Sequence, residues 1–353
     1  MEGIAKKSIL TRILTVLLLL AILTSIVPGA GAVSINDDCK LIPMGNTVGI
    51  KIESDGVIVV GLSEVDDGKL KTAPAAKAGI RVGDIITQLN SKKIQSVADF
   101  KDAVKRFGNN EVTVRVMREG KPRQLSLVPA KNENGNPEIG IWLRDGIVGI
   151  GTITYMEPES GAFGALGHSV SDIDTGIMLP LKKGCVMKSK VLAVKKGSAG
   201  MPGELKGNFD LLCSIGELYA NTSYGIFGRF DSKSDLKSGN PVPVALRSEI
   251  KPGKATILSN INGTSVEKYE IEISRIYPAN ETGIRDMMIT VTDPKLIEAT
   301  GGIVQGMSGS PIMQNGKIIG AVTHVLVNDP CKGYAICIEN MLNEDKKYME
   351  KAA

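Results

Sequence analysis

The segment Gly306-Met307-Ser308-Gly309-Ser310-Pro311 is the most informative part of this 353-residue chain. One glycine two residues before the serine and another directly after it allow a sharp turn of the backbone. Such a turn can point backbone N–H groups at an oxygen that gains negative charge during a reaction. The hexapeptide therefore makes Ser308 a candidate nucleophile.

A serine nucleophile needs a general base, and the chain contains two histidines, His168 and His324. His168 is the better candidate, because it lies far before Ser308 and can come from a different part of the fold. A third residue, a carboxylate, would orient the imidazole. Seven aspartates lie between His168 and Ser308, and spacing alone does not choose among them: Asp172, Asp174, Asp210, Asp231, Asp235, Asp286 and Asp293.

The hexapeptide resembles the G-x-S-G-[GS]-P signature of chymotrypsin-like proteases. Residues 312–327, with a turn at Gln314-Asn315-Gly316-Lys317, match the hairpin that these enzymes place after the nucleophile. Short segments of strand character, punctuated by Gly and Pro, run from residue 139 onward and favour a β-sandwich or barrel. The resemblance implies two barrels, with His168 from the first and Ser308 from the second, and an oxyanion hole made by the N–H groups of Gly306 and Ser308.

An earlier part of the chain has a different pattern. Residues 48–53 and 56–65 read as strands around a turn at Ser54-Asp55-Gly56, and a short helix is expected at 74–79. Ser96 resembles the first residue of a capping box that opens a longer helix. Residues 78–86, Ala-Gly-Ile-Arg-Val-Gly-Asp-Ile-Ile, resemble the A-G-[IL]-x-x-G-D-x-I segment of bacterial PDZ domains.

A PDZ domain binds an extended peptide beside an edge strand, against its long helix. By this resemblance, the loop and strand at 45–50 would receive the peptide, and the helix would form the opposite wall. The peptide-binding residues predicted in this way are Gly45, Asn46, Thr47, Val48, Gly49, Ile50, Val97 and Val104. A Pro-Met-Gly-Asn-Thr sequence at 43–47 replaces the usual Gly-Leu-Gly-Phe-like loop, so capture of a peptide carboxylate and binding of an internal segment both stay open.

The PDZ-like segment, Gly-Ala-Leu-Gly-His at 164–168, the serine hexapeptide and Gly-Ala-Val-Thr-His-Val at 320–325 together resemble the SpoIVB peptidase family of spore-forming bacteria. The resemblance places the catalytic triad on His168, Asp293 and Ser308, with Asp172 and Asp174 as the next candidates for the acid. It also implies a sporulation protease that is exported between the two forespore membranes. There it would cleave itself and a membrane-anchored regulator, which starts intramembrane proteolysis and sigma-factor processing. His324 is hypothesised to line the pocket for the residue before the scissile bond.

The N-terminus has the layout of a secretory signal. Lys6, Lys7 and Arg12 precede an uncharged apolar run at 13–27, and the small residues of Ala30-Gly31-Ala32 follow. Export is expected, with the segment either cleaved or retained as an anchor. The net charge of +4 is scattered and argues against nucleic-acid binding. No cofactor and no metal are predicted, because the two histidines and five cysteines show no ligand spacing.

These observations predict a mainly β protein: an N-terminal PDZ domain of α+β type followed by a chymotrypsin-like double β-barrel serine protease domain. The expected boundaries are 1–32 for the signal or anchor, 33–42 for a linker, 43–130 for the PDZ domain, 131–138 for a second linker and 139–353 for the protease. The expected partners are a protein substrate and peptides bound by the PDZ domain. The alternative is an inactive PDZ scaffold that holds membrane partners.

Overall fold

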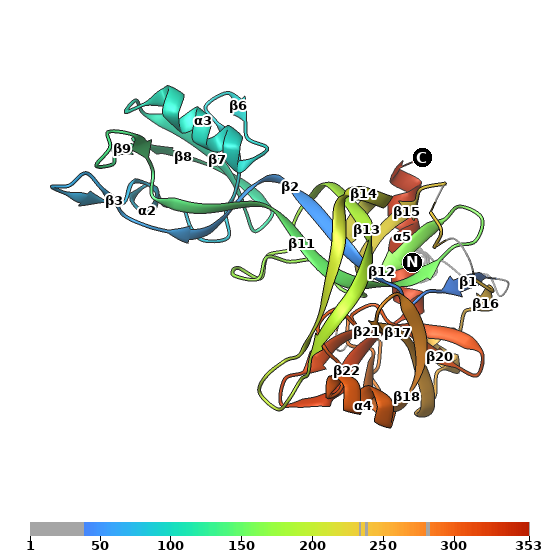
Figure 1. Ribbon diagram of the computed structural model, residues 1–353. Helices are drawn as coiled ribbons and strands as arrows, with labels where there is room; N and C mark the ends of the chain where they lie inside the picture. The colour runs from blue at the N-terminus through green and yellow to red at the C-terminus, as the bar shows by residue number, and fades with distance from the viewer. Residues whose placement is uncertain (1–38, 233, 237–238, 280–282, 353) are drawn as a thin grey trace, which may run out of the picture. The chain divides into compact units, whose positions relative to one another are not determined.

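The computed structural model describes residues 39–232, 234–236, 239–279 and 283–352 (Figure 1). The predicted signal segment, 1–32, and most of the 33–42 linker lie outside these residues. Within the described part of the chain, no helix is both long enough and apolar enough to cross a membrane.

Six strands close into a first barrel. The strand order β11-β12-β15-β14-β13-β2 becomes a ring because β11 also pairs with β2. Buried residues such as Val48, Ile153 and Phe163 fill its interior. The strands are β2 (Thr47–Leu62), β11 (Ile141–Met156), β12 (Ala162–Ala165), β13 (Leu181–Lys195), β14 (Glu204–Thr222) and β15 (Gly225–Phe230).

A second closed barrel follows in the sequence, with the strand order β17-β18-β19-β22-β21-β20. Its core includes Ile257, Ile289 and Val322, each almost fully buried. Helix α4 (Pro294–Thr300) connects β19 to the segment that carries Ser308. The strands are β17 (Gly253–Asn262), β18 (Ser265–Ile276), β19 (Met287–Val291), β20 (Pro311–Gln314), β21 (Lys317–Leu326) and β22 (Asp329–Cys337). Two barrels of six strands confirm the predicted mainly β, chymotrypsin-like protease domain.

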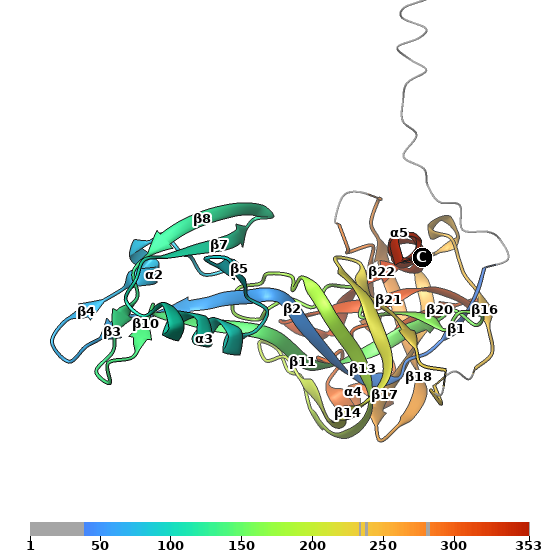
Figure 2. The same ribbon diagram turned by 90° about the horizontal axis from the view of Figure 1, so that it is seen from above.

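Smaller elements border the barrels. Strand β1 (Lys40–Pro43) pairs with both β11 and β16 (Val242–Pro243), and a short 3₁₀ helix, η1, spans Arg247–Glu249. Helix α5 (Ile338–Ala352) is the last element of the described chain. In Figure 2, α5 lies beside strands of both barrels, in agreement with its contacts to β14, β21 and β22.

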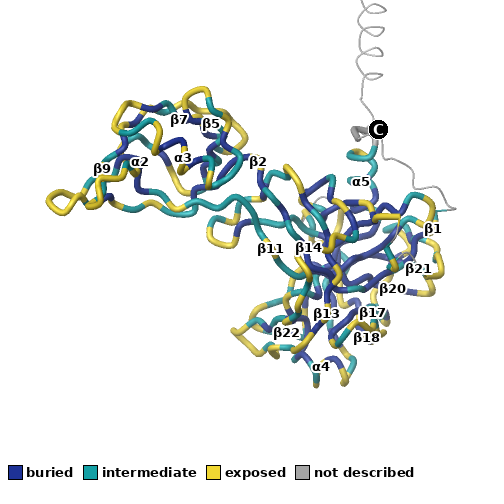
Figure 3. Tube along the Cα trace, turned by 45° about the horizontal axis from the view of Figure 1, so that its top comes forward, coloured by how far each residue is buried: buried dark blue, intermediate teal, exposed yellow. Residues whose placement is uncertain are grey.

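The PDZ domain has a core of its own, built around Val59, Ile86 and Val114. The predicted helix start is confirmed: the Ser96 side chain accepts a hydrogen bond from the Asp99 N–H and caps α3. The Asp99 carboxylate accepts from the N–H of Gln95 rather than of Ser96, so the box is not reciprocal. The elements are β3 (Val65–Asp66), β4 (Lys71–Thr72), α2 (Pro74–Lys77), β5 (Ile85–Leu89), β6 (Lys92–Lys93), α3 (Val97–Phe107), β7 (Val112–Arg118), β8 (Lys121–Leu127), β9 (Ala130–Lys131) and β10 (Pro137–Glu138). Figure 3 shows buried segments inside this domain and inside both barrels.

Strands β2 and β11 belong to both the PDZ domain and the first barrel. Thr47 to Glu53 of β2 pair with β11 and with β13 in the barrel, whereas Val57 and Ile58 pair with β5 of the PDZ domain. The expected hairpin turn at 54–56 is therefore wrong: β2 is continuous, and the register shift opposite residues 144–146 of β11 takes up the irregularity. Residues 43–54 pack in the protease barrel. The predicted boundaries at 43 and 139 therefore assign β2 wholly to the PDZ domain and β11 wholly to the protease domain, although both domains share the two strands.

Candidate active site

Ser308 lies in a tight turn between α4 and β20. Gly306 and Gly309 have φ angles of +98° and +97°, a region that favours glycine. A Cβ on Gly309 would come within 2.0 Å of the Thr152 carbonyl oxygen and 2.6 Å of the Leu166 nitrogen. The second glycine of the motif is therefore required by close packing against the first barrel as well as by its backbone angles.

Two backbone N–H groups of this turn form no hydrogen bond within the described ranges. Among the described residues, the N–H groups of Gly306 and Ser308 have no recorded hydrogen bond, whereas the neighbouring Met307 and Gly309 donate to Val304 and Val322. Two unpaired donors next to a serine hydroxyl can bind the oxyanion of a tetrahedral intermediate. These are the two donors that the resemblance to chymotrypsin-like enzymes predicted.

His168 follows strand β12 by way of two residues with positive φ. Leu166 has a φ of +68° and Gly167 a φ of +70°. Such an angle is uncommon for a leucine, and positions of this kind cluster at functional sites. The double turn brings the chain sharply out of β12 and presents His168 at the edge of the first barrel.

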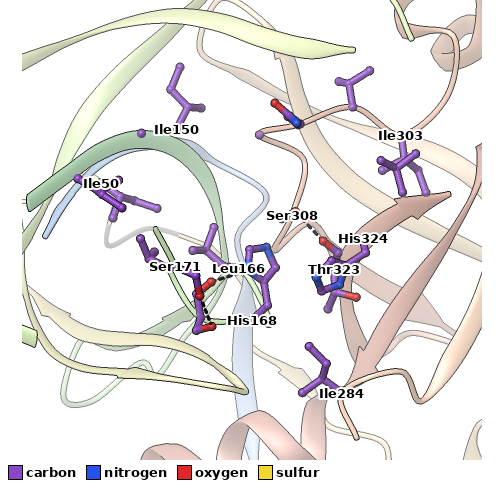
Figure 4. Close-up of a pocket in the computed structure, with 18 residues that line it drawn as sticks. Ile50, Ile150, Leu166, His168, Ser171, Ile284, Ile303, Ser308, Thr323 and His324 are labelled. Carbon is purple, nitrogen blue, oxygen red and sulfur yellow. Dashed lines mark hydrogen bonds between the residues drawn. The ribbon is translucent and has the colours of Figure 1, made fainter. Parts of the chain in front are cut away.

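Ser308, His168 and His324 line one cavity of about 540 Å³ between the two barrels (Figure 4). The first barrel contributes Ile50, Ile147, Gly149, Ile150, Leu166, His168, Ser169, Val170 and Ser171. The second contributes Ile284, Ile303, Val304, Gln305, Gly306, Ser308, Thr323, His324 and Val325. Mostly apolar walls with a few convergent polar groups are typical of a binding site.

The Ser308 hydroxyl donates a hydrogen bond of 2.7 Å to the carbonyl oxygen of Thr323, and no bond to His168 is recorded. Thr323 lies where the register of β21 and β22 shifts, between the pairs Val322–Ala335 and His324–Tyr334. Bulges of this kind re-aim groups near active sites. The hydroxyl must turn away from this carbonyl before a base can take its proton.

The His168 ring is oriented by a backbone carbonyl. Its Nδ1 lies 2.8 Å from the Ser169 oxygen, and because a carbonyl only accepts, Nδ1 carries the proton. Nε2 is then the unprotonated, basic nitrogen. Burial lowers the pKa of His168 below 6.5, and the bond to Ser169 only partly offsets this effect. His168 is therefore neutral, as a general base must be, at neutral pH.

His324 stands beside His168, with 5.0 Å between the ring centroids. The residue as a whole is exposed. Partial burial of the ring lowers its pKa most, and the nearby His168 and Arg285 lower it further, to about 4. The ring is thus neutral at neutral pH and offers one hydrogen-bond donor and one acceptor to the cavity. Its location agrees with the proposed role in a substrate pocket.

The structure does not bring Asp293 to His168. Asp293 is the N-cap of α4, where its carboxylate accepts hydrogen bonds from the N–H groups of Glu270, Lys295 and Leu296. It does not line the cavity, and no carboxylate among the described residues contributes to the pKa of His168. The assignment of Asp293 as the triad acid therefore has no geometric support. An Asp followed by Pro is a helix-start signal, which the sequence already contained.

Asp172 and Asp174 have another partner. Both carboxylates form ion pairs with Arg144 of β11, and the Asp172 side chain is fully buried. Burial raises the pKa of Asp172, but the bonds from Arg144 and Thr175 outweigh this and hold it below its usual value. These two aspartates tie down the loop after His168 and make no recorded contact with its ring.

The peptide groove of the PDZ domain differs from the predicted one. Val97 and Val104 of α3 do line a groove of about 500 Å³, but its other wall is formed by residues 136–143 and not by 45–50. Residues 141–144 of β11 pair only with β2 among the described strands, so their other edge faces α3. Gly45, Asn46, Thr47, Val48, Gly49 and Ile50 lie at the first barrel instead, because β2 pairs there with β11 and β13. In this chain the strand that borders the helix follows the predicted PDZ segment in the sequence.

Comparison with known proteins adds a family. The model of the SpoIVB peptidase S55 family matches residues 135–342, and a PDZ domain model matches residues 47–128. The chain belongs to the SpoIVB peptidase S55 family. It is therefore a PDZ-containing serine protease, and the predicted resemblance is confirmed.

Relatives and solved structures match parts of this S55 peptidase. The Regulator of sigma-W protease RasP of Bacillus subtilis is 32% identical over 114 residues, 31% of this chain and 24% of RasP. The chain spans 14% to 24% of the length of the curated relatives it matches. A PDZ domain of an SdrC-like protein from Listeria monocytogenes is 27% identical, with a TM-score of 0.21, over 25% of this chain and 87% of that one. The active form of the Rv3671c protease from Mycobacterium tuberculosis is 16% identical, with a TM-score of 0.33, over 57% and 74% of the two chains.

Several residues of the S55 peptidase site could not be found from sequence. Thr323 and Ser169 act through backbone carbonyls, which any residue type can supply. Thr152, which contacts the serine turn, is one threonine in a strand that reads as ordinary β structure. No group of three or more His, Cys, Asp or Glu side chains that could hold a metal is present in the described ranges.

Proposed function

We propose that this S55 peptidase is an exported endopeptidase in which Ser308 is the nucleophile and His168 the general base. The observation that carries the proposal is the convergence of both side chains on one cavity. The N–H groups of Gly306 and Ser308 lie beside it, and neither has a hydrogen-bond partner in the described part of the chain. The resemblance to chymotrypsin-like enzymes supports the same roles.

The chemistry follows from these positions. The Ser308 hydroxyl turns from Thr323 to Nε2 of His168 and attacks the scissile carbonyl while the imidazole takes its proton. The N–H groups of Gly306 and Ser308 stabilise the oxyanion. His168 then gives the proton to the leaving amine, and a water molecule repeats the sequence to release the acyl group. The Ser169 carbonyl, which holds Nδ1, stabilises the imidazolium in place of a carboxylate.

His324 would select the side chain before the scissile bond. A neutral imidazole with one donor and one acceptor suits a glutamine or a hydroxyl side chain better than an apolar one. The experiment is cleavage of a peptide library by wild type and H324A. An unchanged preference at that substrate position would rule the role out.

The biological role rests on the family. Like the sporulation proteases that this chain resembles, it would cleave itself and a membrane-anchored regulator between the forespore membranes, so that an intramembrane protease can process a sigma factor. The apolar run at 13–27 supports export. The groove between α3 and residues 136–143 is the place where a peptide segment of such a partner would bind.

The test compares full-length wild type with S308A in cell membranes. Mass spectrometry of new N-termini should find cuts in the chain itself and in the exported segments of membrane-anchored proteins, with wild type only. A phosphatase fused to the C-terminus should be active, as expected outside the cytoplasm. Identical N-termini from the two proteins would refute the proteolytic role, and an inactive phosphatase would refute export.

A further inference from the structure

Thr152 of β11 is fully buried and contacts both halves of the active site. Its hydroxyl donates to the Gly306 carbonyl oxygen over 2.7 Å, and its N–H donates to the Ser308 carbonyl oxygen over 3.0 Å. Its own carbonyl accepts from the Leu166 N–H over 3.2 Å, two residues before His168. One residue of the first barrel thus joins the nucleophile turn to the turn that presents the base.

Two of these bonds hold the carbonyl oxygens of the oxyanion turn, residues 305–309. Each carbonyl oxygen from Gln305 to Ser308 accepts one hydrogen bond. The donors are the Leu205 N–H for Gln305, the Thr152 hydroxyl for Gly306, the Ser310 N–H for Met307 and the Thr152 N–H for Ser308. Only the bond to Gly306 comes from a side chain. Glycine has few steric limits on its backbone angles. The bond to the Gly306 carbonyl therefore restricts the backbone rotation that would change how the Gly306 and Ser308 N–H groups are oriented relative to each other.

We propose that Thr152 is a positioning residue for the serine chemistry: its hydroxyl holds the oxyanion turn in the geometry that leaves the N–H groups of Gly306 and Ser308 pointing into the cavity. This inference rests on the nucleophile role proposed for Ser308. Thr152 touches no reacting atom, so its contribution should be felt in the transition state and much less in substrate binding.

The matched control lies two residues away. Thr154 is on the same strand and equally buried, but its hydroxyl has no hydrogen-bond partner among the described residues. Thr→Val at either position exchanges a hydroxyl for a methyl of similar size. The two variants therefore differ in one respect, the bond to Gly306.

The experiment measures kcat and KM of the full chain on one peptide, together with inhibition by the matching peptide aldehyde, which forms an oxyanion on Ser308. T152V should lower kcat by roughly 10- to 100-fold. The two donors are misaligned and not removed, so the loss should not exceed the about 10² to 10³ that complete loss of one oxyanion donor costs. KM should stay within about twofold, and the aldehyde should bind more weakly by a factor close to the loss in kcat. T152S should restore most of the activity, and T154V should match wild type. If T152V does not fold, T152C replaces it.

Normal kcat in folded T152V, or equal losses in T152V and T154V, would overturn the inference while the proposed function stands. Weakening of substrate and aldehyde by the same factor would also overturn it, because that would indicate a general packing defect. Wild type no more active than S308A would refute the serine chemistry itself, and the inference with it.

Discussion

Asp293 shows how one residue type can satisfy two different signals. The sequence order made it a candidate acid. Its carboxylate instead accepts hydrogen bonds from two N–H groups in the first turn of α4 and from the N–H of Glu270. Asn and Asp are about equally good at an N-cap, whereas Ala costs about 1 kcal/mol. The two substitutions therefore separate capping from catalysis.

We expect D293N to retain kcat within a few-fold and to lose less stability than D293A. The amide oxygen can still cap α4, whereas the amide nitrogen cannot accept from the Glu270 N–H. D293A should lower the unfolding free energy by about 1 kcal/mol. Thermal unfolding and steady-state kinetics measure both. A loss of about 10⁴ in kcat for a folded D293N would instead restore Asp293 as the acid of the triad.

The pH dependence of catalysis follows from His168. Burial lowers its pKa, so the neutral, basic form persists below pH 6.5. The acidic limb of kcat/KM should therefore lie below pH 6.5, measured over pH 4 to 9. H324A serves as control, because loss of the neighbouring ring should shift this limb little while changing substrate preference. A limb above 6.5 would mean that a carboxylate raises the pKa of His168 in the working enzyme.

At the scale of elements, the loop after His168 depends on two ion pairs that share Arg144. Arg144 of β11 binds Asp172, whose carboxylate is buried, and Asp174, which is exposed. Removal of one partner leaves a buried charge without compensation, which costs several kcal/mol. This loop carries the carbonyl of Ser169 that orients the base.

We expect R144M to lower the unfolding free energy by about 3 kcal/mol and to reduce kcat. The double variant R144M/D172N should recover stability, because the buried charge is gone. K188M, which breaks the exposed pair with Asp235, should cost less than about 1 kcal/mol. Chemical denaturation provides the measurement, and equal effects of R144M and K188M would contradict this view of the loop.

The sequence predicted the individual helices, strands and turns of this protein better than which strands pair with one another. The serine turn and the helix start at Ser96 follow from local patterns and are present in the structure, and both histidines line the cavity. The peptide groove was misplaced because the resemblance to PDZ domains assigned it to residues 45–50, whereas the strand pattern there fits any half-buried sheet. Which neighbour β2 pairs with depends on β11, a strand almost a hundred residues later in the chain.

At the scale of the whole molecule, β11 is shared by two sites. Its first residues form one wall of the PDZ groove, and Thr152 near its end holds the oxyanion turn.

The corrected groove makes a direct prediction about peptide binding: V97E should weaken binding of peptides selected from a display library, because it places a charge in the groove. V128E, on an exposed valine of the same domain outside the groove, should leave binding unchanged.

Calorimetric titration of the selected peptides into the full chain measures this difference. A variant at the originally predicted strand would have a different effect: G49A should destabilise the first barrel, because a Cβ there would meet the Phe209 ring at 2.6 Å. Equal peptide affinity of V97E and wild type would show that peptides bind elsewhere.

The most direct test of the account is labelling of the full chain with a fluorophosphonate, which reacts only with an activated serine hydroxyl. Mass spectrometry should place the label on Ser308 in wild type. S308A should take up none, and H168Q should react at least 100-fold more slowly, since the general base contributes about 10² to 10⁴. Label on another serine, or equal rates for wild type and H168Q, would contradict the assignment of Ser308 and His168 as nucleophile and base.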